Sequence, residues 1–202
     1  MEILELYCGT KSFSNVAKEK GHEVFTIDNN PKFKPDLCID MLNFNKSMLP
    51  KGFKPDFIWC SPPCETFSLS GNSYYYGYPT NARAYIGLAL AYKCLEIIRE
   101  LKPKFWVIEN PRAGLRSVWF MKPLEKTTAT YCQYGMKNMK PTDLFNNFGF
   151  KAKCCKNGMP CHESAPRGSR TGTQGEKSTE VRGVVPRQLC EEILRTVEVQ
   201  KR

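Results

Sequence analysis

The feature that most constrains the fold of this chain is an alternation of short apolar segments with helical patterns through its first two thirds. The apolar segments are rich in β-branched and aromatic residues and end at turn residues, which is typical of buried strands. Strands alternating with helices predict an α/β fold: a Rossmann-like, mostly parallel sheet with helices on both faces and ligands at the carboxyl ends of the strands. The predicted strands are residues 2–7, 23–28, 36–40, 56–60 and 105–110, and the predicted helices are residues 12–20, residues 81–101 and one opened by Pro186.

Charge and cysteine content indicate which partner and which cellular compartment to expect. The 202 residues suit a single main domain, and 30 Lys and Arg against 20 Asp and Glu give a net charge of +10, which favours a polyanionic partner. The amino terminus has no basic leader before its apolar segment, and no run of about 18 apolar residues occurs. We therefore expect a cytoplasmic monomer without a membrane partner, in which the ten cysteines are buried, catalytic or metal-binding rather than paired in disulfides.

The turn after the first predicted strand has the features of a ligand-binding turn. The sequence LELYCGTKSFS places Gly9 between a strand and a helix, where backbone can approach a ligand and free N–H groups are available. Asp28 lies about 20 residues further on, a spacing suited to ribose hydroxyls of an adenosine-type cofactor. Asp40 ends the third predicted strand in the same way. The alternative is that Asp28 and Asp40 only cap turns.

Two side chains have the chemistry of a nucleophile and an acid. Cys64 in CSPPCETFS follows two prolines whose fixed φ angles would present its thiol rigidly into the cleft, whereas Cys60 is expected in the core. Glu109 ends the apolar segment FWVIEN, where a carboxyl group can share a proton with a substrate. A structural acid paired with a lysine is the alternative for Glu109. Together beside a cofactor cleft, Cys64 and Glu109 form a candidate catalytic pair.

Three motifs resemble those of the cytosine-C5 DNA methyltransferases, in that family's order. They are LELYCGTKSFS, SPPCETFS and VIENP, and VRGVVPRQL is similar to the family's last motif. The resemblance covers residues 1 to 145 and implies S-adenosylmethionine as methyl donor, double-stranded DNA as partner and a flipped cytosine as substrate. By the same resemblance, Ser68 and Asn110 contact the substrate. The implied cofactor-binding residues are Tyr7, Gly9, Thr10, Ser12, Asp28, Asn29, Asp40 and Pro62.

The resemblance also implies a covalent mechanism. Cys64 would add to C6 of cytosine while Glu109 donates a proton to N3. Because a duplex hides C6, the base must be rotated out of the stack. The segment SLSGNSYYYGYPTNARA after the nucleophile suits a mobile flap. The small size of the chain suggests an accessory enzyme of a phage or another virus, or of a restriction-modification system.

The chain departs from the family pattern in several places. Lys11 stands where members usually have a second glycine, and Gly183 replaces an asparagine. The family's arginine-bearing motif is not recognisable, and YCQYGMKNMKPTD takes its place. The target-recognition region is unusually short. We predict a catalytic domain over residues 1–145, a basic, Cys-rich, recognition-like segment over residues 146–182, and a helix in residues 183–202 that packs back on the catalytic domain.

The recognition-like segment contains a candidate metal site and candidate DNA contacts. Cys155, Cys161 and His162, completed by Cys132, could hold a structural zinc ion; otherwise these are buried or reduced thiols. Arginine can read guanine and glutamine can read adenine in the major groove, although a solvated linker would have a similar composition. The candidate DNA-contacting residues are Arg167, Arg170, Thr173 and Gln174.

Three other functions compete with DNA cytosine-C5 methylation. Amino-methyltransferases also end a strand in a small polar residue and two prolines, but they place an aromatic ring next, where this chain has Cys64. An RNA or tRNA cytosine-C5 methyltransferase would share the fold. A non-catalytic nucleic-acid-binding homologue is suggested by Lys11 and the short recognition region.

Overall fold

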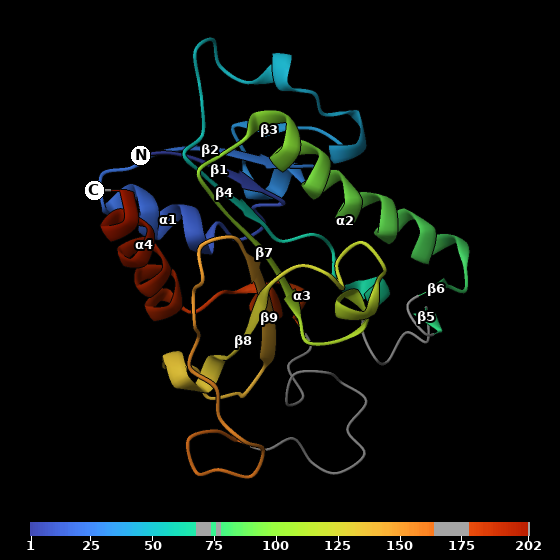
Figure 1. Cartoon of the computed structure of the whole chain (residues 1–202), viewed down its shortest axis with the longest axis vertical. Helices are drawn as coiled ribbons and strands as arrows, with labels where there is room; N and C mark the ends of the chain where they lie inside the picture. Colours follow the sequence, from blue (N-terminus) through green and yellow to red (C-terminus); the bar gives the residue numbers. More distant parts are fainter. Residues whose placement is uncertain (68–73, 76–77, 164–177, 202) are drawn as a thin grey trace.

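The computed structural model describes residues 1–67, 74–75, 78–163 and 178–201 (Figure 1). Within these residues, a seven-stranded sheet has the strand order β3-β2-β1-β4-β7-β9-β8. A separate two-stranded ribbon pairs β5 (Tyr74–Tyr75) with β6 (Tyr78–Pro79). The strands of the main sheet are β1 (Glu2–Leu6), β2 (Glu23–Asp28), β3 (Leu37–Cys38), β4 (Phe57–Cys60), β7 (Phe105–Pro111), β8 (Lys126–Thr130) and β9 (Pro141–Asn146).

The direction of the strands divides the sheet into two parts. Strands β3, β2, β1, β4 and β7 run parallel, as the sequence predicted. Strands β9 and β8 run antiparallel to their neighbours at the other edge. The chain order reverses between β1 and β4, and a doubly wound sheet opens a ligand crevice at such a point, outside the carboxyl ends of the strands. The turn containing Gly9 and the loop containing Cys64 both leave the sheet there.

Helices cover both faces of the sheet, which confirms the predicted layers (Figure 1). On one face, α1 (Ser12–Glu19) and α4 (Arg187–Lys201) pack in a core with Phe57 and Trp59 of β4. On the other face, α2 (Ala82–Leu101) packs against Leu4, Ile58 and Ile108 of three neighbouring strands. Strand β4 therefore alternates its side chains between two cores, which is why all four of its residues are buried.

Several sequence predictions require correction at the ends of elements. Strand β3 is only two residues long, so Asp40 does not end a strand; it caps a 3-10 turn by accepting a hydrogen bond from the Leu42 N–H. Strand β8 was not among the predicted strands; it ends at Thr130, and Tyr131–Tyr134 form a 3-10 turn. Strand β9 was missed: its polar sequence PTDLFN becomes buried only through pairing on both sides.

A short helix lies at the end of the recognition-like segment, and the long carboxyl-terminal helix follows it. Helix α3 (Thr179–Gly183) is capped by Ser178, whose hydroxyl accepts a hydrogen bond from the Val181 N–H. Helix α4 follows Pro186 and buries Leu189, Ile193 and Val197 beside α1. In the part of the chain that the structure describes, none of the helices is both long and apolar enough to cross a bilayer.

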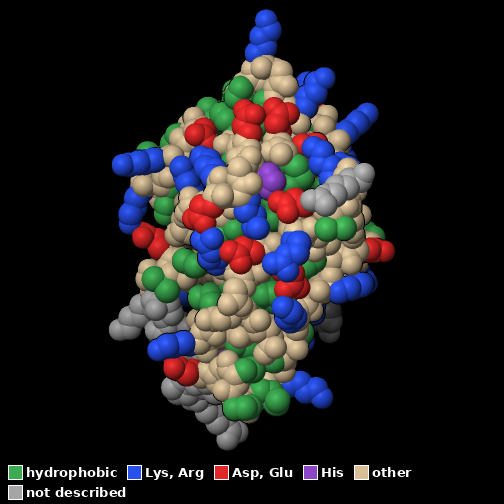
Figure 2. Space-filling model, turned by 90° about the vertical axis from the view of Figure 1, so that its left-hand side faces the viewer, with side chains coloured by type: hydrophobic (Ala, Val, Ile, Leu, Met, Phe, Trp, Pro, Cys, Tyr) green, Lys and Arg blue, Asp and Glu red, His purple; other side chains and the backbone are tan. Residues whose placement is uncertain are grey.

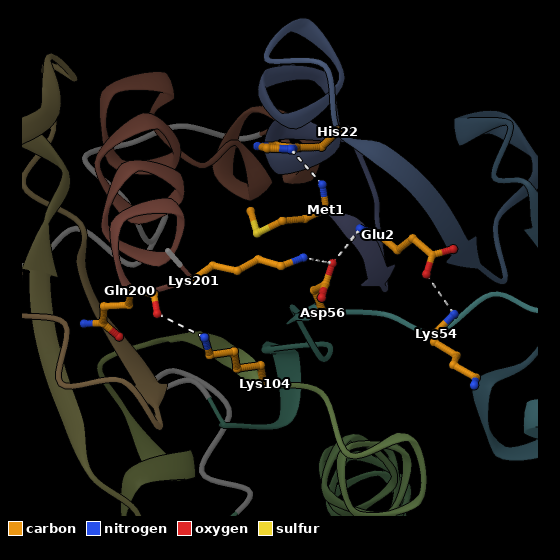
Figure 3. Close-up of polar contacts among 8 residues, drawn as sticks. All are labelled: Met1, Glu2, His22, Lys54, Asp56, Lys104, Gln200 and Lys201. Atoms are coloured by element: carbon orange, nitrogen blue, oxygen red, sulfur yellow. Dashed lines mark hydrogen bonds and ion pairs between the residues drawn. The ribbon is translucent and has the colours of Figure 1, made fainter.

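Polar contacts join the two ends of the chain at the amino-terminal edge of the parallel strands (Figure 3). The Asp56 carboxylate accepts hydrogen bonds from the Glu2 N–H at 3.1 Å and from Lys201 Nζ at 2.6 Å. Lys104 Nζ donates to the Gln200 carbonyl at 3.0 Å. The end of α4 is thus fixed to the starts of β1, β4 and β7. These starts lie at the amino-terminal ends of the parallel strands, opposite the crevice at their carboxyl ends.

The face formed by α1 and α4 has charges of both signs. Figure 2 shows basic and acidic side chains interspersed over it. Arg187 pairs with Glu19 between the two helices at 2.5 Å, and Lys153 pairs with Glu192 at 2.7 Å. A surface on which acidic residues separate the basic ones attracts a polyanion only weakly. We therefore do not assign DNA binding to this face.

Candidate active site

The turn after β1 is held in an unusual backbone conformation by Asp28. Tyr7, Gly9 and Lys11 all have positive φ, at 58°, 44° and 58°. The buried Asp28 carboxylate accepts the Gly9 N–H on one oxygen and the Asn30 N–H on the other, both at 2.9 Å. Asp28 therefore braces the turn from the end of the neighbouring strand. A Cβ atom at Gly9 would meet nothing within 4 Å, so the turn presents backbone to open space, as a cofactor turn requires.

The turn is also joined to the carboxyl-terminal segment. The Ser12 hydroxyl is 2.9 Å from the Thr10 hydroxyl and accepts the Val185 N–H at 3.2 Å. Val185 immediately precedes the proline that opens α4. The motif at the end of the sequence therefore lies against the motif at its beginning, and the two form one wall of the crevice.

The other predicted cofactor residues have different surroundings. The Tyr7 hydroxyl donates to the Leu90 carbonyl of α2 at 2.8 Å, so its ring spans from the turn to that helix. Asn29 and Asp40 are exposed on the outer side of β2 and β3. Pro62 is buried in the loop after β4.

The loop that carries Cys64 is fixed at several points. The Ser61 N–H donates to the Leu6 carbonyl at 3.2 Å, which continues the pairing of β4 with β1. The buried Asn110 side chain donates from Nδ2 to the Pro62 carbonyl at 3.0 Å. The Phe67 N–H donates to the Cys64 carbonyl at 3.0 Å, which closes the 3-10 turn Glu65–Phe67. Cys64 itself is exposed, whereas Cys60 is fully buried in the core, as the sequence predicted.

Glu109 is buried on β7, next to the strand that leads to Cys64. Its carboxylate accepts a hydrogen bond at 3.0 Å from the hydroxyl of Tyr131, which is fully buried. Lys140 lies over the other side of the Tyr131 ring, with Nζ 4.6 Å from the ring centroid, and donates to the Arg182 carbonyl of α3. The acid on β7 is therefore held by Tyr131 in the turn after β8, and Lys140, just before β9, packs on that tyrosine.

Electrostatic coupling links Cys64, Glu109 and Lys140. Partial burial and the negative charge of Glu109 raise the pKa of the Cys64 thiol, and the positive charge of Lys140 acts to lower it. Burial lowers the pKa of Lys140, although the charges of Glu109 and Cys64 oppose this change. The charge of Glu109 therefore acts on both Cys64 and Lys140, and Cys64 and Lys140 act on each other, as expected of a nucleophile and a cation beside an acid in one site.

Sequence reasoning missed Tyr131 and Lys140. Both lie in YCQYGMKNMKPTD, the segment that stands where the resembling family has an arginine-bearing motif. A lysine in that segment could have indicated a cation in the site, in place of the arginine of the family's motif. Nothing in the sequence indicated that the Tyr131 hydroxyl would reach Glu109, because the contact depends on the antiparallel placement of β8 and β9 beside β7.

The predicted substrate- and DNA-contacting residues differ in what the structure describes. Asn110 is buried at the end of β7 with its Oδ1 atom unpaired among the described residues. Two points of the recognition-like segment are attached near Lys140: the Glu163 N–H donates to the Lys137 carbonyl at 2.8 Å, and α3 is joined to Lys140 through the Arg182 carbonyl. Outside the described residues lie Ser68, Arg167, Arg170, Thr173 and Gln174.

The four predicted metal ligands are brought together from two segments. Cys132 lies in the turn after β8, and Cys155, Cys161 and His162 lie in the irregular stretch after β9. One potential ligand atom from each of the four lies within 4.8 Å of the others.

Comparison with known proteins identifies the family. Residues 1–135 match the model of the C-5 cytosine-specific DNA methylases. A probable DNA (cytosine-5)-methyltransferase of Frog virus 3 (isolate Goorha) is 30% identical over 200 residues, which cover 89% of this chain and 91% of that protein.

Two solved structures share the fold. A mutant of Spodoptera frugiperda DNMT2 superposes with a TM-score of 0.50 at 17% identity, over 75% of this chain and 53% of that one. A putative DNA modification methyltransferase encoded within an Escherichia coli prophage has a TM-score of 0.50 at 18% identity, over 72% of this chain and 46% of the other. The chain thus spans about half the length of each of these structures. On the family match over most of its length, this chain belongs to the C-5 cytosine-specific DNA methylases, a family of cytosine-5 methyltransferase enzymes.

Proposed function

We propose that this chain methylates C5 of cytosine in double-stranded DNA, with S-adenosylmethionine as methyl donor and Cys64 as covalent nucleophile. The observation that carries the proposal is the position of Cys64, an exposed residue on an anchored loop whose thiol is electrostatically coupled to the buried acid Glu109. Cys64 follows β4 at the switch point of the sheet, where folds of this kind bind their ligands, and Glu109 lies toward the carboxyl end of the neighbouring strand β7.

The donor would bind against the turn that contains Gly9. S-adenosylmethionine supplies an electrophilic methyl group on its sulfonium. Backbone at Gly9 faces open space, and the hydroxyls of Thr10 and Ser12 lie beside it. Asp28 uses both oxygens to hold the turn, so we assign it to shaping the site and to contact with the ribose through its remaining lone pairs. Tyr7, Asn29, Asp40 and Pro62 complete the proposed cofactor residues.

In the first step, the Cys64 thiolate adds to C6 of a cytosine that has been rotated out of the duplex, at a cost of a few kcal/mol for unstacking. Formation of the S–C6 bond is accompanied by proton transfer from Glu109 to N3, which leaves an electron-rich C5. C5 would then bond to the methyl group as the methyl–sulfur bond of the sulfonium breaks, which leaves a neutral thioether. Loss of the C5 proton to a base would finally expel Cys64 as a thiolate, and N3 would return its proton to Glu109.

The surroundings of Glu109 suit this proton transfer. The Tyr131 hydroxyl holds one carboxylate oxygen, and we assign the other to the contact with N3. A protonated Glu109 no longer raises the pKa of Cys64, so the acid form of one residue favours the thiolate form of the other. The Oδ1 atom of Asn110, which has no hydrogen-bond partner among the described residues, offers an acceptor to the substrate.

The DNA would meet the molecule at the carboxyl ends of the strands. In this proposal, residues 1–145 form the catalytic unit, residues 146–182 contact DNA, and residues 183–202 close the fold. Glu163 and α3 are attached near Lys137 and Lys140. These attachments support a recognition-like segment that leaves the fold beside Lys140 of the proposed active site. Ser68 would contact the flipped nucleotide, and we assign base reading to Arg167, Arg170, Thr173 and Gln174. A monomer acting in the cytoplasm of a bacterial or host cell completes the proposal.

A trapping assay tests the chemistry. Duplex DNA containing 5-fluorocytosine has no C5 proton to lose, so incubation with S-adenosylmethionine should leave a covalent adduct that is visible as a shift in mass. Cys64→Ser should abolish the adduct, whereas Cys38→Ser should retain it, because Cys38 is equally an exposed thiol but lies at the outer strand β3. Bisulfite sequencing of DNA from cells that express the wild type would then give the target site.

The same assay separates the alternatives. An adduct with 5-fluorocytosine RNA and none with DNA would identify an RNA methyltransferase. Tight DNA binding without any adduct in the wild type would overturn the enzymatic proposal in favour of a binding protein.

A further inference from the structure

A cluster of three thiols and one imidazole lies outside the methyl-transfer site. The Sγ atom of Cys132 is 3.2 Å from that of Cys155 and 3.9 Å from that of Cys161. The Nδ1 atom of His162 is 3.6 Å from the Cys155 sulfur and 3.5 Å from the Cys161 sulfur. The side chains therefore converge on one point through their potential ligand atoms.

These separations fit tetrahedral zinc. With Zn–S bonds of about 2.3 Å and Zn–N bonds of about 2.0–2.1 Å, ligand atoms at the corners of a tetrahedron lie about 3.8 Å apart for two sulfurs and about 3.5 Å apart for sulfur and nitrogen. Three of the four measured separations agree with these values within a few tenths of an ångström. The 3.2 Å between Cys132 and Cys155 is shorter, but it is far longer than the bond of about 2.05 Å in a disulfide.

Gln133 supplies an outer contact of the kind that metal-bound thiolates use. Its side-chain Nε2 donates to the Cys161 sulfur at 3.3 Å and points toward the Cys132 sulfur at 4.0 Å. An N–H donor beside two sulfurs stabilises negative charge on them. Three sulfurs and one nitrogen are a soft ligand set that favours zinc over magnesium or calcium.

The stretch that carries three of the ligands is attached to the fold by hydrogen bonds and an ion pair rather than by a core of its own. Residues 151–163 contain no helix or strand, and most of them are exposed. Hydrogen bonds attach the stretch at separate points: the Cys155 N–H donates to Thr130 Oγ1 at 2.8 Å, and the Glu163 N–H donates to the Lys137 carbonyl. A metal ion would join these attachments into one rigid unit.

We propose that Cys132, Cys155, Cys161 and His162, the last through Nδ1, bind one structural zinc ion that fixes residues 151–163 to the turn after β8. One of its ligands, Cys132, directly follows Tyr131, whose hydroxyl holds the catalytic acid Glu109. Zinc would therefore set the position of the recognition-like segment relative to Tyr131 and Glu109. The site is closed, with four protein ligands, so its role is structural.

Elemental analysis of the full-length protein, purified under reducing conditions without chelator, tests the site directly. The wild type should carry about one zinc ion per chain. Cys155→Ser and Cys161→Ser should each lose most of it, and Co²⁺ substituted into the wild type should show the intense visible bands of a tetrahedral thiolate site. Cys154→Ser is the matched control: Cys154 adjoins Cys155, is exposed, and should leave the zinc content unchanged. Equal losses in Cys154→Ser and Cys155→Ser would overturn the assignment.

Thiol protection in the wild type tests the same proposal without variants that could misfold. Zinc should protect Cys132, Cys155 and Cys161 from alkylation, as followed by peptide mass spectrometry, while Cys154 and Cys38 react. A strong chelator should abolish the protection. A metal-free protein whose thiols all react before chelation, or a Cys132–Cys155 disulfide in the reduced preparation, would refute the zinc site. Because neither readout depends on methyl transfer, the result is separate from the fate of the proposed function.

Discussion

At the residue scale, the charge of a few side chains decides whether Cys64 can act. Its thiol is neutral for most of the time near pH 7, because partial burial and Glu109 both raise its pKa above the ordinary value of 9.0. Lys140 is the cation that opposes them. Lys140 occupies a strained backbone position at φ 28°, which supports a positioning role for a residue that must reach the site from just before β9.

Two substitutions should move the reactivity of Cys64 in opposite directions. Glu109→Gln removes the anion and should shift the pH profile of Cys64 alkylation to lower pH, whereas Lys140→Met removes the cation and should shift it to higher pH. A shift of about half a pH unit in each case corresponds to a roughly threefold change in alkylation rate at a fixed pH below the pKa. Peptide mass spectrometry after brief iodoacetamide treatment measures the rate at Cys64 itself.

Cys38 provides the internal control for this experiment, since it is exposed and lies on the outer strand β3. Its alkylation profile should be the same in the wild type and both variants. Shifts of the same sign at Cys64, or equal shifts at Cys38, would contradict electrostatic coupling within the site.

At the element scale, the loop that carries Cys64 is set by its packing on α2. The 3-10 turn Glu65–Phe67 lies against Gly87 so closely that a Cβ atom there would be 2.0 Å from Thr66 Oγ1 and 3.0 Å from Thr66 Cβ. On its other side, the Phe67 carbonyl would lie 3.0 Å from a Cβ atom at Gly114. Glycine at these two positions lets the nucleophile loop sit between a helix and the turn after β7.

Gly87→Ala should therefore displace the loop. Overpacking of this kind costs about 1–3 kcal/mol of folding free energy, and turnover should fall because Cys64 moves with the turn. Adding Thr66→Ala removes the nearest atom and should restore part of both losses. Chemical denaturation and single-turnover methylation measure the two effects.

Gly183→Ala is the matched substitution in open space, because a Cβ atom at Gly183 meets nothing within 4 Å. It should leave the unfolding free energy nearly unchanged. If Gly87→Ala behaved in the same way, the close packing of this loop on α2 would not control its position.

At the scale of the whole molecule, contacts between the two ends of the chain stabilise the sheet at the amino-terminal ends of its parallel strands, opposite the proposed active site. Partial burial acts to raise the pKa of Asp56, but hydrogen bonds from Lys201 and the Glu2 N–H, together with nearby positive charges, outweigh it and hold the pKa below the ordinary value of 3.8. An acid with a lowered folded-state pKa contributes stability that is present above its unfolded pKa and lost as pH falls through the folded pKa.

Asp56→Asn should consequently lower the unfolding free energy by about 1 kcal/mol at pH 7, and the difference from wild type should shrink as pH falls below about 4. Urea titrations at a series of pH values measure this. Glu100→Gln breaks an exposed pair with Lys46, at 3.4 Å, and should cost almost nothing at any pH. A pH-independent difference for Asp56→Asn would rule out its ion pair as the cause.

The parallel part of the fold could be predicted from the sequence, because hydrophobic periodicity and glycine and proline positions are local signals. Strands β1, β2, β3, β4 and β7, the helices α1, α2 and α4, the buried Cys60 and the family motifs could all be predicted from short stretches, whereas β5 and β6 were not predicted. The same stretches identified Cys64, Glu109, Gly9 and Asp28 as candidates for the site.

Only the tertiary structure decided how distant residues meet. The polar strand β9 has no strong strand pattern of its own and depends on β7 and β8 for its burial. That antiparallel pairing brings Tyr131 to Glu109, Lys140 to the edge of the site and Cys132 to the three ligands that follow β9. Contacts of this kind depend on register between segments far apart in sequence, and no local pattern fixes register across such distances.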